Sequence, residues 1–458
     1  MEDMKNGKRS SFSGKLGYVL AAAGASVGLG NIWRFPYLAA KYGGGIFLII
    51  YIVLALTFGY TMIVAETAIG RMTRKSPVGA FKSFGKKKWL SFGGWINAVI
   101  PVLIVPYYSV IGGWVIKYLV EYFRGNAKLL AEDGYFTDFI SNGVSAELCF
   151  VAFCAFTLII IFAGVQNGIE RVSKIMMPIL IILSVIIAVY SVTRPGALAG
   201  VKYFLVPNVK NFSWMTVVSA MGQMFYSLSI AMGILITFGS YMKKDTAIED
   251  STRNVEIFDT GIAIMAGLMI IPAVFAFSGG DPDTLQAGPS LMFITIPKVF
   301  QNMGFGTVIG IVFFVLVLFA AVTSSIALTE SAVSTFEDEL GWGRKKATVL
   351  LGVIMLALGS LSSLGYGPLA GIKIIGMQFL DLFDFLTNSV MMPIAALITS
   401  LLVSRVVGID KIEEEIIHGE SAFRRKKVFV VMIKYLCPVF AIIILLSSVA
   451  NALGWIKM

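Results

Sequence analysis

Residues 24–31 read GASVGLGN, a run of small residues inside an apolar stretch that is otherwise long enough to cross a membrane. Gly24, Gly28 and Gly30 disfavour a helix here, because each glycine in a helix interior costs about 1 kcal/mol relative to alanine. Unpaired backbone amides and carbonyls are costlier still in hydrocarbon. A helix can therefore break at this depth only where protein or water covers the freed groups, and those groups can then hold a small polar ligand or an ion.

The rest of the chain has the composition of a polytopic helical membrane protein. Of its 458 residues, 57% are hydrophobic and 14% are charged, whereas soluble domains have about 25% charged residues. No segment is long and polar enough to form a soluble domain. Apolar stretches of span length predict about eleven transmembrane helices, at residues 15–38, 43–70, 90–122, 146–163, 172–192, 214–241, 255–277, 305–336, 346–363, 374–403 and 428–452.

The net charge of +10 follows the expected topology, so we expect no nucleic-acid partner. Lysine and arginine gather in alternate loops, which include Lys5, Lys8 and Arg9 and then residues 71–88, 243–253, 344–346 and 405–427. An excess of basic residues marks the cytoplasmic side of a membrane protein. The pattern predicts a cytoplasmic N-terminus and, after eleven spans, an external C-terminus at residues 454–458.

Cysteine and histidine give no sign of a disulfide framework or a zinc site. Cys149, Cys154 and Cys437 lie in apolar segments, where cysteine usually serves as a packing residue. His418 is the only histidine and lies in a predicted cytoplasmic loop.

A second interruption, YSLSIAMG at residues 226–233, lies five spans after the first. Paired interrupted spans in corresponding halves point to a secondary transporter with inverted repeats and a midplane site between the breaks. Channels also contain broken helices, so this alternative stays open. We predict one transmembrane domain over residues 1–453, with repeats at 15–193 and 214–403 and an additional helix at 428–452.

The first break also fits two other patterns. Gly24 and Gly28 are spaced as in a helix-packing face, although packing does not require the amide of Asn31 to enter the membrane. Residues 24–28 match G-x-S-x-G, but that hydrolase motif needs a strand–turn–helix and a histidine partner, which this membrane segment lacks. We therefore expect a protein that is not an enzyme.

Charged side chains inside spans are functional candidates because burying them in a membrane is costly. For Glu66 we favour a structural role, in which its carboxyl group caps amides freed by a broken helix. Arg34 and Asp384 fit an ion pair across a vestibule, either as a static clamp or as a moving gate. Asp259, together with Asn31 and Ser227, offers the hard oxygen ligands that suit Na⁺.

Hydroxyl groups in spans three and eight have two interpretations each. Thr323 and Ser324 can bond back to their own helix, as mid-helix hydroxyls often do, or they can form a second ion site. Tyr107 and Tyr108 follow Pro106 and either pack or donate a hydrogen bond at the break.

Together these motifs resemble the neurotransmitter:sodium symporter family, in its bacterial hydrophobic amino-acid transporter branch. The resemblance covers nearly the whole chain and is carried by GASVGLGNIWRFPYLAAKYGGGIFLIIY, GQMFYSLS, FAAVTSSIA and FEDEL. GIERVSKIMMP, from Gly168 to Pro178, resembles the family's span-five unwinding motif. The implied fold is all-α, with about eleven transmembrane helices in the five-plus-five inverted repeat of the leucine-transporter type. A bacterial leucine transporter of this family is the standard example of that architecture. Helices one and six are the broken ones.

The resemblance implies two Na⁺ sites and no organic cofactor. The first site would use the Ser26 carbonyl with the side chains of Asn31, Ser227 and Asp259. The second would use carbonyls of Gly24, Val27 and Ala320 with the hydroxyls of Thr323 and Ser324.

The resemblance also implies a substrate site for a neutral L-amino acid. The amides of Leu29 and Gly30 and the Tyr108 hydroxyl would bind its carboxylate, since amides at a half-helix N-terminus favour an anion. Its amino group would face carbonyls of Ser26, Tyr226, Ser227 and Ser229. The side-chain pocket would comprise Ile104, Tyr226, Ser229, Met232, Ser324 and Leu328, which is mostly apolar and predicts hydrophobic or aromatic substrates.

Two gates are implied as well. Arg34 with Asp384 resembles the outer gate, with Tyr226 as a lid, and Arg9 with Asp338, near Tyr241, resembles the inner gate. Phe12 departs from the tryptophan usual beside the inner gate.

Another departure concerns chloride. Asp259 stands at or beside a position where chloride-dependent relatives carry a neutral amide, so we expect chloride-independent transport.

The expected function is Na⁺-coupled import of neutral hydrophobic or aromatic L-amino acids by alternating access. The chain would lie in the cell inner (plasma) membrane, with the substrate and the lipid bilayer as partners and no oligomer required. A ligand-gated channel, a membrane enzyme and a non-transporting scaffold are the rival classes.

Overall fold

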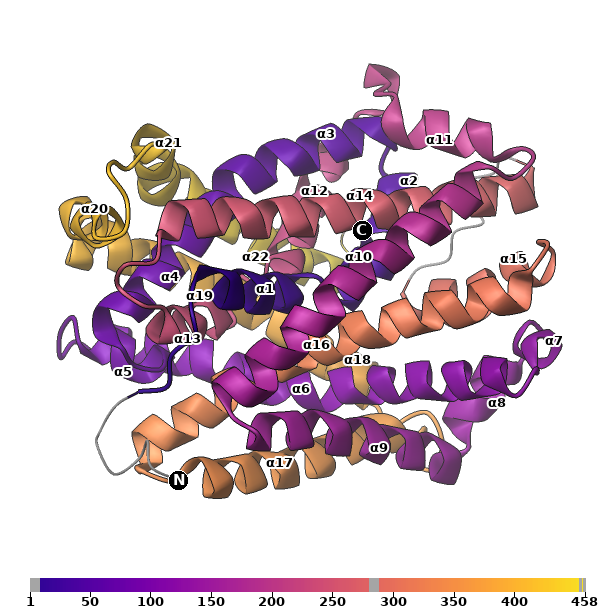
Figure 1. Cartoon of the computed structure of the whole chain (residues 1–458), viewed down its shortest axis with the longest axis horizontal. Coiled ribbons are helices and arrows are strands. Elements are labelled where there is room, and N and C mark those ends of the chain that lie inside the picture. Colours follow the sequence, from indigo (N-terminus) through magenta and orange to yellow (C-terminus); the bar gives the residue numbers. More distant parts are fainter. Residues whose placement is uncertain (1–8, 280–287, 453–454, 456–458) are drawn as a thin grey trace.

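The computed structural model describes residues 9–279, 288–452 and 455. Lys5, Lys8 and residues 280–287, 453–454 and 456–458 lie outside the described residues, so the predicted N-terminal charge cluster is covered only in part and the predicted external C-terminus is covered only at Trp455. Within the described residues the chain is helical and forms no strand. Long helices run side by side along the longest axis of the molecule (Figure 1).

The first half of the chain begins with a broken span and continues with four long ones. Several spans contain a π-helical turn, labelled η here. The elements are α1 (Lys15–Ser26), η1 (Gly30–Arg34), α2 (Phe35–Lys41), α3 (Gly45–Leu54), η2 (Ala55–Gly59), α4 (Tyr60–Thr73), α5 (Pro77–Lys82), α6 (Lys88–Phe123), α7 (Ala127–Leu130), α8 (Tyr135–Ser141), α9 (Gly143–Phe162), η3 (Val165–Glu170) and α10 (Arg171–Val192).

The second half follows a short connection formed by α11 (Ala197–Leu205) and the 3₁₀ turn η4 (Val209–Asn211). Its elements are α12 (Trp214–Ser227), α13 (Ile234–Tyr241), α14 (Ile248–Ser278), η6 (Leu291–Thr295), α15 (Ile296–Gln301), α16 (Gly306–Leu340), α17 (Arg344–Leu364), α18 (Phe379–Asp384), η7 (Phe385–Met391), α19 (Met392–Leu401), η8 (Leu402–Val407), α20 (Ile409–Ile417), α21 (Lys426–Val431), η9 (Met432–Leu436) and α22 (Cys437–Ala452).

The predicted spans agree with these helices. Nine helices among the described residues are long and apolar enough to cross a membrane, and the bent pair Lys15–Ser26 and Gly30–Lys41 makes a tenth. The one remaining predicted span, the sixth at 214–241, consists of the two shorter helices α12 and α13. The last repeat helix begins at Phe379 rather than at residue 374, because Ile374 and Met377 pair in an isolated bridge before it.

Both predicted helix breaks are present. The first span bends by 53° between Ser26 and Gly30. In the sixth, residues 228–233 separate α12 from α13, and the non-glycine residues Ser229 (φ 53°) and Ala231 (φ 59°) adopt left-handed backbone conformations there. Such conformations cost of order 1 kcal/mol or more each and tend to cluster at functional sites.

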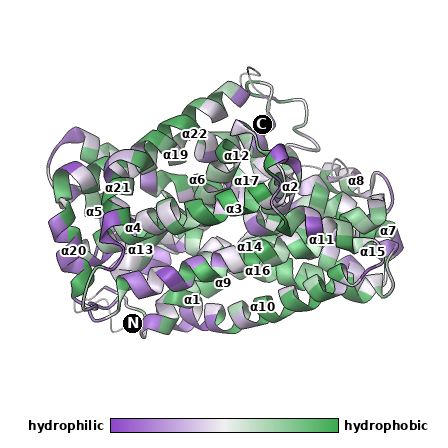
Figure 2. Cartoon of the chain, turned by 90° about the horizontal axis from the view of Figure 1, so that it is seen from above, coloured by the Kyte–Doolittle hydropathy of each residue, from purple (hydrophilic) through white to green (hydrophobic). Residues whose placement is uncertain are grey.

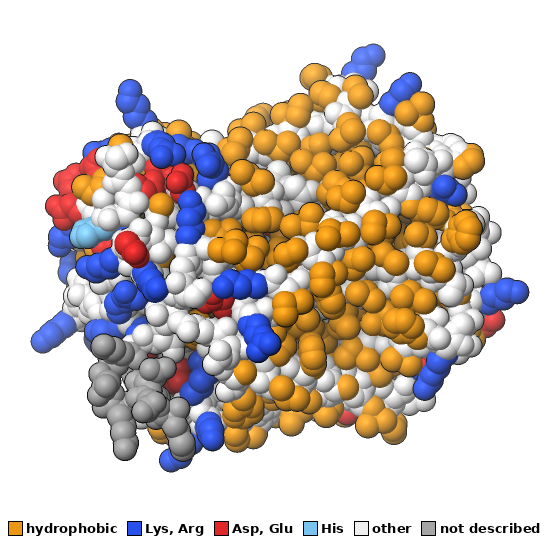
Figure 3. All heavy atoms as spheres, in the orientation of Figure 1, with side chains coloured by type: hydrophobic (Ala, Val, Ile, Leu, Met, Phe, Trp, Pro, Cys, Tyr) orange, Lys and Arg blue, Asp and Glu red, His pale blue; other side chains and the backbone are white. Residues whose placement is uncertain are grey.

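The surface of the molecule is apolar in the middle of its long axis and charged toward the end of that axis where α5 and α20 lie. Figure 3 shows a broad hydrophobic band, while charged side chains gather at the left end, where α5, α20 and α21 lie in Figure 1. Viewed from above, the helices are mainly hydrophobic along their length, with hydrophilic stretches concentrated toward the ends (Figure 2). The distribution matches a protein whose middle lies in lipid and whose ends face water.

Candidate functional site between the two helix breaks

A cavity of about 30 Å³ lies where the two breaks meet. It is lined by every residue that the sequence nominated for substrate binding: Ser26, Leu29, Gly30, Ile104, Tyr108, Tyr226, Ser227, Ser229, Met232, Ser324 and Leu328. Ala25, Gly28 and Asn31 complete the lining. These residues come from the first, third, sixth and eighth spans, so the tertiary fold assembles one site from four separate segments.

The breaks are held together by side chains that satisfy their backbone groups. Ser229 Oγ donates to the Ala25 carbonyl at 3.0 Å. The Ala231 amide donates to Glu66 Oε1 at 2.8 Å, which confirms the predicted capping role of this buried carboxyl group. The Leu29 amide donates to the Tyr108 hydroxyl at 3.3 Å, so Tyr108 faces the break rather than only packing.

A buried oxygen cluster adjoins the first break. Asn31 Nδ2 lies 2.9 Å from Ser227 Oγ and 2.8 Å from Asp259 Oδ1, and the Ser227 hydroxyl donates to Asp259 Oδ1 at 2.7 Å. Tyr51, which the sequence reasoning did not select, donates from its hydroxyl to Asp259 Oδ2 at 2.9 Å. Asn31, Tyr51 and Asp259 are fully buried. The cluster therefore brings one carboxylate, two hydroxyls and the Asn31 amide nitrogen together, while Asn31 Oδ1 accepts a hydrogen bond from the Gly28 amide at 3.1 Å.

A second group of oxygens lies between the first and eighth spans. Ser324 Oγ is 3.3, 3.2 and 3.4 Å from the carbonyl oxygens of Gly24, Ala25 and Val27. Thr323 Oγ1 bonds back to its own helix, at 2.9 Å from the Phe319 carbonyl and 3.2 Å from that of Ala320. Thr323 thus donates back to its own helix, which leaves its oxygen able to accept a cation, whereas Ser324 reaches across to the break.

Gln223 is a further buried polar residue that the sequence reasoning did not select. Its Nε2 donates to the Gly30 carbonyl at 3.0 Å. Tyr51 and Gln223 could have been found from the sequence only as polar atoms inside apolar spans, because nothing in their local pattern indicates the break that they face.

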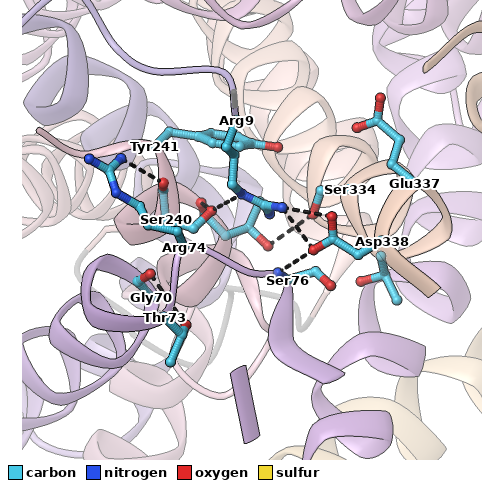
Figure 4. Close-up of polar contacts among 12 residues, drawn as sticks. Arg9, Gly70, Thr73, Arg74, Ser76, Ser240, Tyr241, Ser334, Glu337 and Asp338 are labelled. Carbon is cyan, nitrogen blue, oxygen red and sulfur yellow. Dashed lines mark hydrogen bonds and ion pairs between the residues drawn. The ribbon is translucent and has the colours of Figure 1, made fainter. Parts of the chain in front are cut away.

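The inner ion pair is formed. Arg9 Nη1 lies 2.7 Å from Asp338 Oδ1, and Arg9 Nε donates to Ser240 Oγ at 2.8 Å (Figure 4). The Ser76 amide donates to Asp338 Oδ2 at 2.6 Å, and the Arg9 guanidinium lies 5.2 Å from the centre of the Tyr241 ring. The pKa of Arg9 is raised, because the neighbouring Tyr241 and Asp338 outweigh the lowering effect of burial. Phe12 packs edge-on against Tyr241, so an aromatic contact is kept at this position.

The predicted outer ion pair is not formed. Arg34 and Asp384 make no contact within 4.0 Å among the ion pairs of the described residues. The Arg34 guanidinium instead lies 5.4 Å from the centre of the Tyr226 ring. Asp384 Oδ1 accepts hydrogen bonds from Asn388 Nδ2 at 2.5 Å and from the Tyr107 hydroxyl at 3.2 Å. Each charge therefore has another partner, Tyr226 for Arg34 and Asn388 with Tyr107 for Asp384.

The span-five motif is helical in this structure. Residues Val165–Glu170 form a π-helical turn, and Pro178 lies inside the continuous helix α10. A side chain at Gly168 would meet the Ile160 carbonyl at 2.1 Å, so the chain packs too closely there for any residue but glycine.

Comparison with known proteins identifies the architecture. The model of the sodium:neurotransmitter symporter family matches residues 9–133 and 135–455. The chain is 34% identical to the sodium-dependent transporter YhdH of Bacillus subtilis, over 97% of this chain and 99% of the relative. It is 31% identical to a sodium-dependent transporter of Haemophilus influenzae, over 97% and 99% of the two chains.

A solved structure agrees with this assignment. The crystal structure of MhsT in complex with L-phenylalanine has a TM-score of 0.86 and 34% identity, and the match covers 96% of this chain and 100% of that chain. The predicted leucine-transporter-type fold is thereby confirmed. With two interrupted helices enclosing a cavity, and with family and structural matches over almost its whole length, this chain belongs to the sodium:neurotransmitter symporter family.

Proposed function

We propose that this chain couples the Na⁺ gradient to the import of neutral hydrophobic or aromatic L-amino acids, independently of chloride. The observation that carries the proposal is the cavity between the two breaks, where backbone groups, one tyrosine hydroxyl and an apolar wall converge. The bound ligand of MhsT, L-phenylalanine, belongs to the same substrate class.

The cavity is suited to a zwitterion with an apolar side chain. Amides at residues 29 and 30 begin the outer half of the first span, where the helix dipole favours a carboxylate. Ile104, Met232 and Leu328 form the apolar part of the lining. A charged substrate side chain would be buried there without a partner, at a cost of several kcal/mol.

The two oxygen clusters are the proposed Na⁺ sites. In the first, Asn31 Nδ2 lies against Ser227 and Asp259. Rotating the amide by half a turn would present Oδ1 to the same place, at the expense of the hydrogen bond that Oδ1 accepts from the Gly28 amide. In the second, Na⁺ would take over the carbonyls that now surround Ser324 Oγ. Oxygen ligands of this kind suit a hard monovalent cation.

The carboxylate of Asp259 is the reason for expecting independence from chloride. It supplies a fixed negative charge beside the proposed first Na⁺ site, where a chloride ion would otherwise balance the cation. Uptake should therefore be unchanged when gluconate replaces chloride, and a strong chloride requirement would contradict this role.

The orientation is also part of the proposal. The end that carries Arg9, Asp338, α5 and α20 would face the cytoplasm of the inner (plasma) membrane, because the basic loops gather there. Coupling would arise because one Na⁺ shares the substrate carboxylate, so that each ligand tightens the binding of the other by the same factor.

A thermal-shift screen of the twenty amino acids in Na⁺ and in K⁺ tests substrate and ion together. We expect stabilisation by a few apolar amino acids, in Na⁺ only. Asn31→Ala should abolish both this stabilisation and Na⁺-dependent uptake. Stabilisation that is equal in K⁺, or that survives in the Asn31 variant, would refute the first ion site.

A further inference from the structure

A shallow surface hollow lies at the start of α17, away from the transport cavity. Its volume is about 480 Å³, and it is lined by Trp342, Lys345, Lys346, Val349, Leu350 and Val353. Three residues, 341–343, separate α17 from the end of α16 at Leu340, close to the inner ion pair of Asp338. The hollow is therefore at the proposed cytoplasmic boundary of the membrane.

The short turn before α17 directs an aromatic side chain outward. Trp342 stands between two glycines, and Gly341 (φ 63°) adopts the left-handed conformation that ends α16. Trp342 is 41% exposed. Exposed tryptophans at the ends of spans usually sit at the level of the lipid headgroups.

The neighbouring basic residues differ in what they contact. Arg344 is engaged with the protein, since its guanidinium pairs with Glu330 at 2.5 Å and donates to the Ile161 carbonyl at 2.9 Å. Lys345 and Lys346 are exposed, and neither forms an ion pair with any residue that the structure describes. Two positive charges are thus available to an external anion on one wall of the hollow.

An apolar strip continues from these lysines along α17. Val349, Val353 and Leu356 are 56%, 59% and 40% exposed, at intervals of four and three residues that place them on one helix face. From Lys345 to Leu356 this face rises about 16 Å, at about 1.5 Å per residue. One leaflet of hydrocarbon is about 15 Å thick, so the strip has the length of a lipid acyl chain.

We propose that this hollow binds one anionic phospholipid. Its phosphate would lie against Lys345 and Lys346, its glycerol region beside Trp342, and one acyl chain along Val349 and Val353. Basic pockets at the cytoplasmic ends of spans select acidic headgroups. A zwitterionic lipid would gain the apolar contacts but not the attraction of two unpaired lysines.

Quenching of Trp342 by lipids with brominated acyl chains measures occupancy of this hollow. The full-length protein in detergent is titrated with brominated phosphatidylglycerol or brominated phosphatidylcholine. The signal of Trp342 is the difference between the parent and Trp342→Phe. We expect half-quenching at a phosphatidylglycerol concentration at least about tenfold below that of phosphatidylcholine. Half-quenching at equal concentrations of the two lipids would overturn the proposal.

Two double variants distinguish a specific lipid-binding site from a general attraction of anionic lipid to surface lysines. In the double variant Lys345→Gln with Lys346→Gln, the phosphatidylglycerol concentration at half-quenching should rise to the value for phosphatidylcholine. Lys86→Gln with Lys87→Gln removes two exposed lysines from another loop and should leave the preference intact. An equal loss in both double variants would refute a specific site. Recovery of Trp342 fluorescence by equimolar inorganic phosphate would also refute it, because the phosphate group alone would then account for the affinity and the acyl chain along Val349 and Val353 would contribute nothing.

Discussion

Breaking the ion pair between Arg9 and Asp338 should open the proposed cytoplasmic side of the cavity by a predictable amount. Arg9 Nη1 lies 2.7 and 2.8 Å from the two carboxylate oxygens of Asp338, whose side chain is 24% exposed against 17% for Arg9. A hydrogen bond to a charged group contributes about 1.5–3 kcal/mol. Partial exposure reduces this to about 1–2 kcal/mol. Since about 1.4 kcal/mol corresponds to a factor of ten, Arg9→Gln should raise the open fraction about 5- to 30-fold.

Asp338→Ala should have the larger effect of the two single variants. It removes the acceptor for both Arg9 and the Ser76 amide, which donates to Asp338 Oδ2 at 2.6 Å. An unpaired buried amide adds about 1–3 kcal/mol. The double variant should open little further than Asp338→Ala alone, because the carboxylate partner of Arg9 is already gone and only its weaker contacts with Ser240 and Tyr241 remain to be lost.

The assay is the rate at which a thiol reagent labels Thr237→Cys, in a chain whose three cysteines have been replaced. Thr237 is fully buried in α13, between the cavity and the gate, so labelling requires opening. Lys82→Gln is the matched control, since it breaks an exposed ion pair with Glu339 at the same end of α16 and should change the rate by less than about twofold. A rate for Arg9→Gln within twofold of the parent would refute the reasoning, as would additive effects in the double variant.

Two further variants test how the breaks are packed. Gly30→Ala should abolish substrate-induced thermal stabilisation, because its new methyl group would lie 2.4 Å from the Tyr226 ring, whereas Gly222→Ala, which meets only Arg34 at 4.0 Å, should retain it. Glu66→Gln keeps an oxygen for the Ala231 amide and should fold normally, but Glu66→Ala leaves that amide unpaired and should lower the free energy of unfolding by about 1–3 kcal/mol, measured by thermal denaturation in detergent. Equal stability of Gln and Ala at position 66 would argue against the capping role.

Much of the fold could be predicted because its determinants are local. Span positions follow from the length of each apolar stretch, and the first break follows from Gly24, Gly28 and Gly30 within eight residues. The second break was harder to derive from conformational preference, since Ser229 and Ala231 adopt left-handed conformations without being glycine. Its position in the chain, five spans after the first, indicated it instead.

The sequence by itself determined the membrane class, the span order and the two interruptions, because hydrophobicity and glycine act over a few neighbouring residues. Only the tertiary structure decided which polar groups meet. It brought Tyr51 to Asp259 across 208 positions of sequence, and it gave Asp384 a partner in Tyr107, 277 positions away, rather than in Arg34. Such pairings depend on how distant helices pack, and differences of an ångström or two in that packing decide whether two charges form a contact.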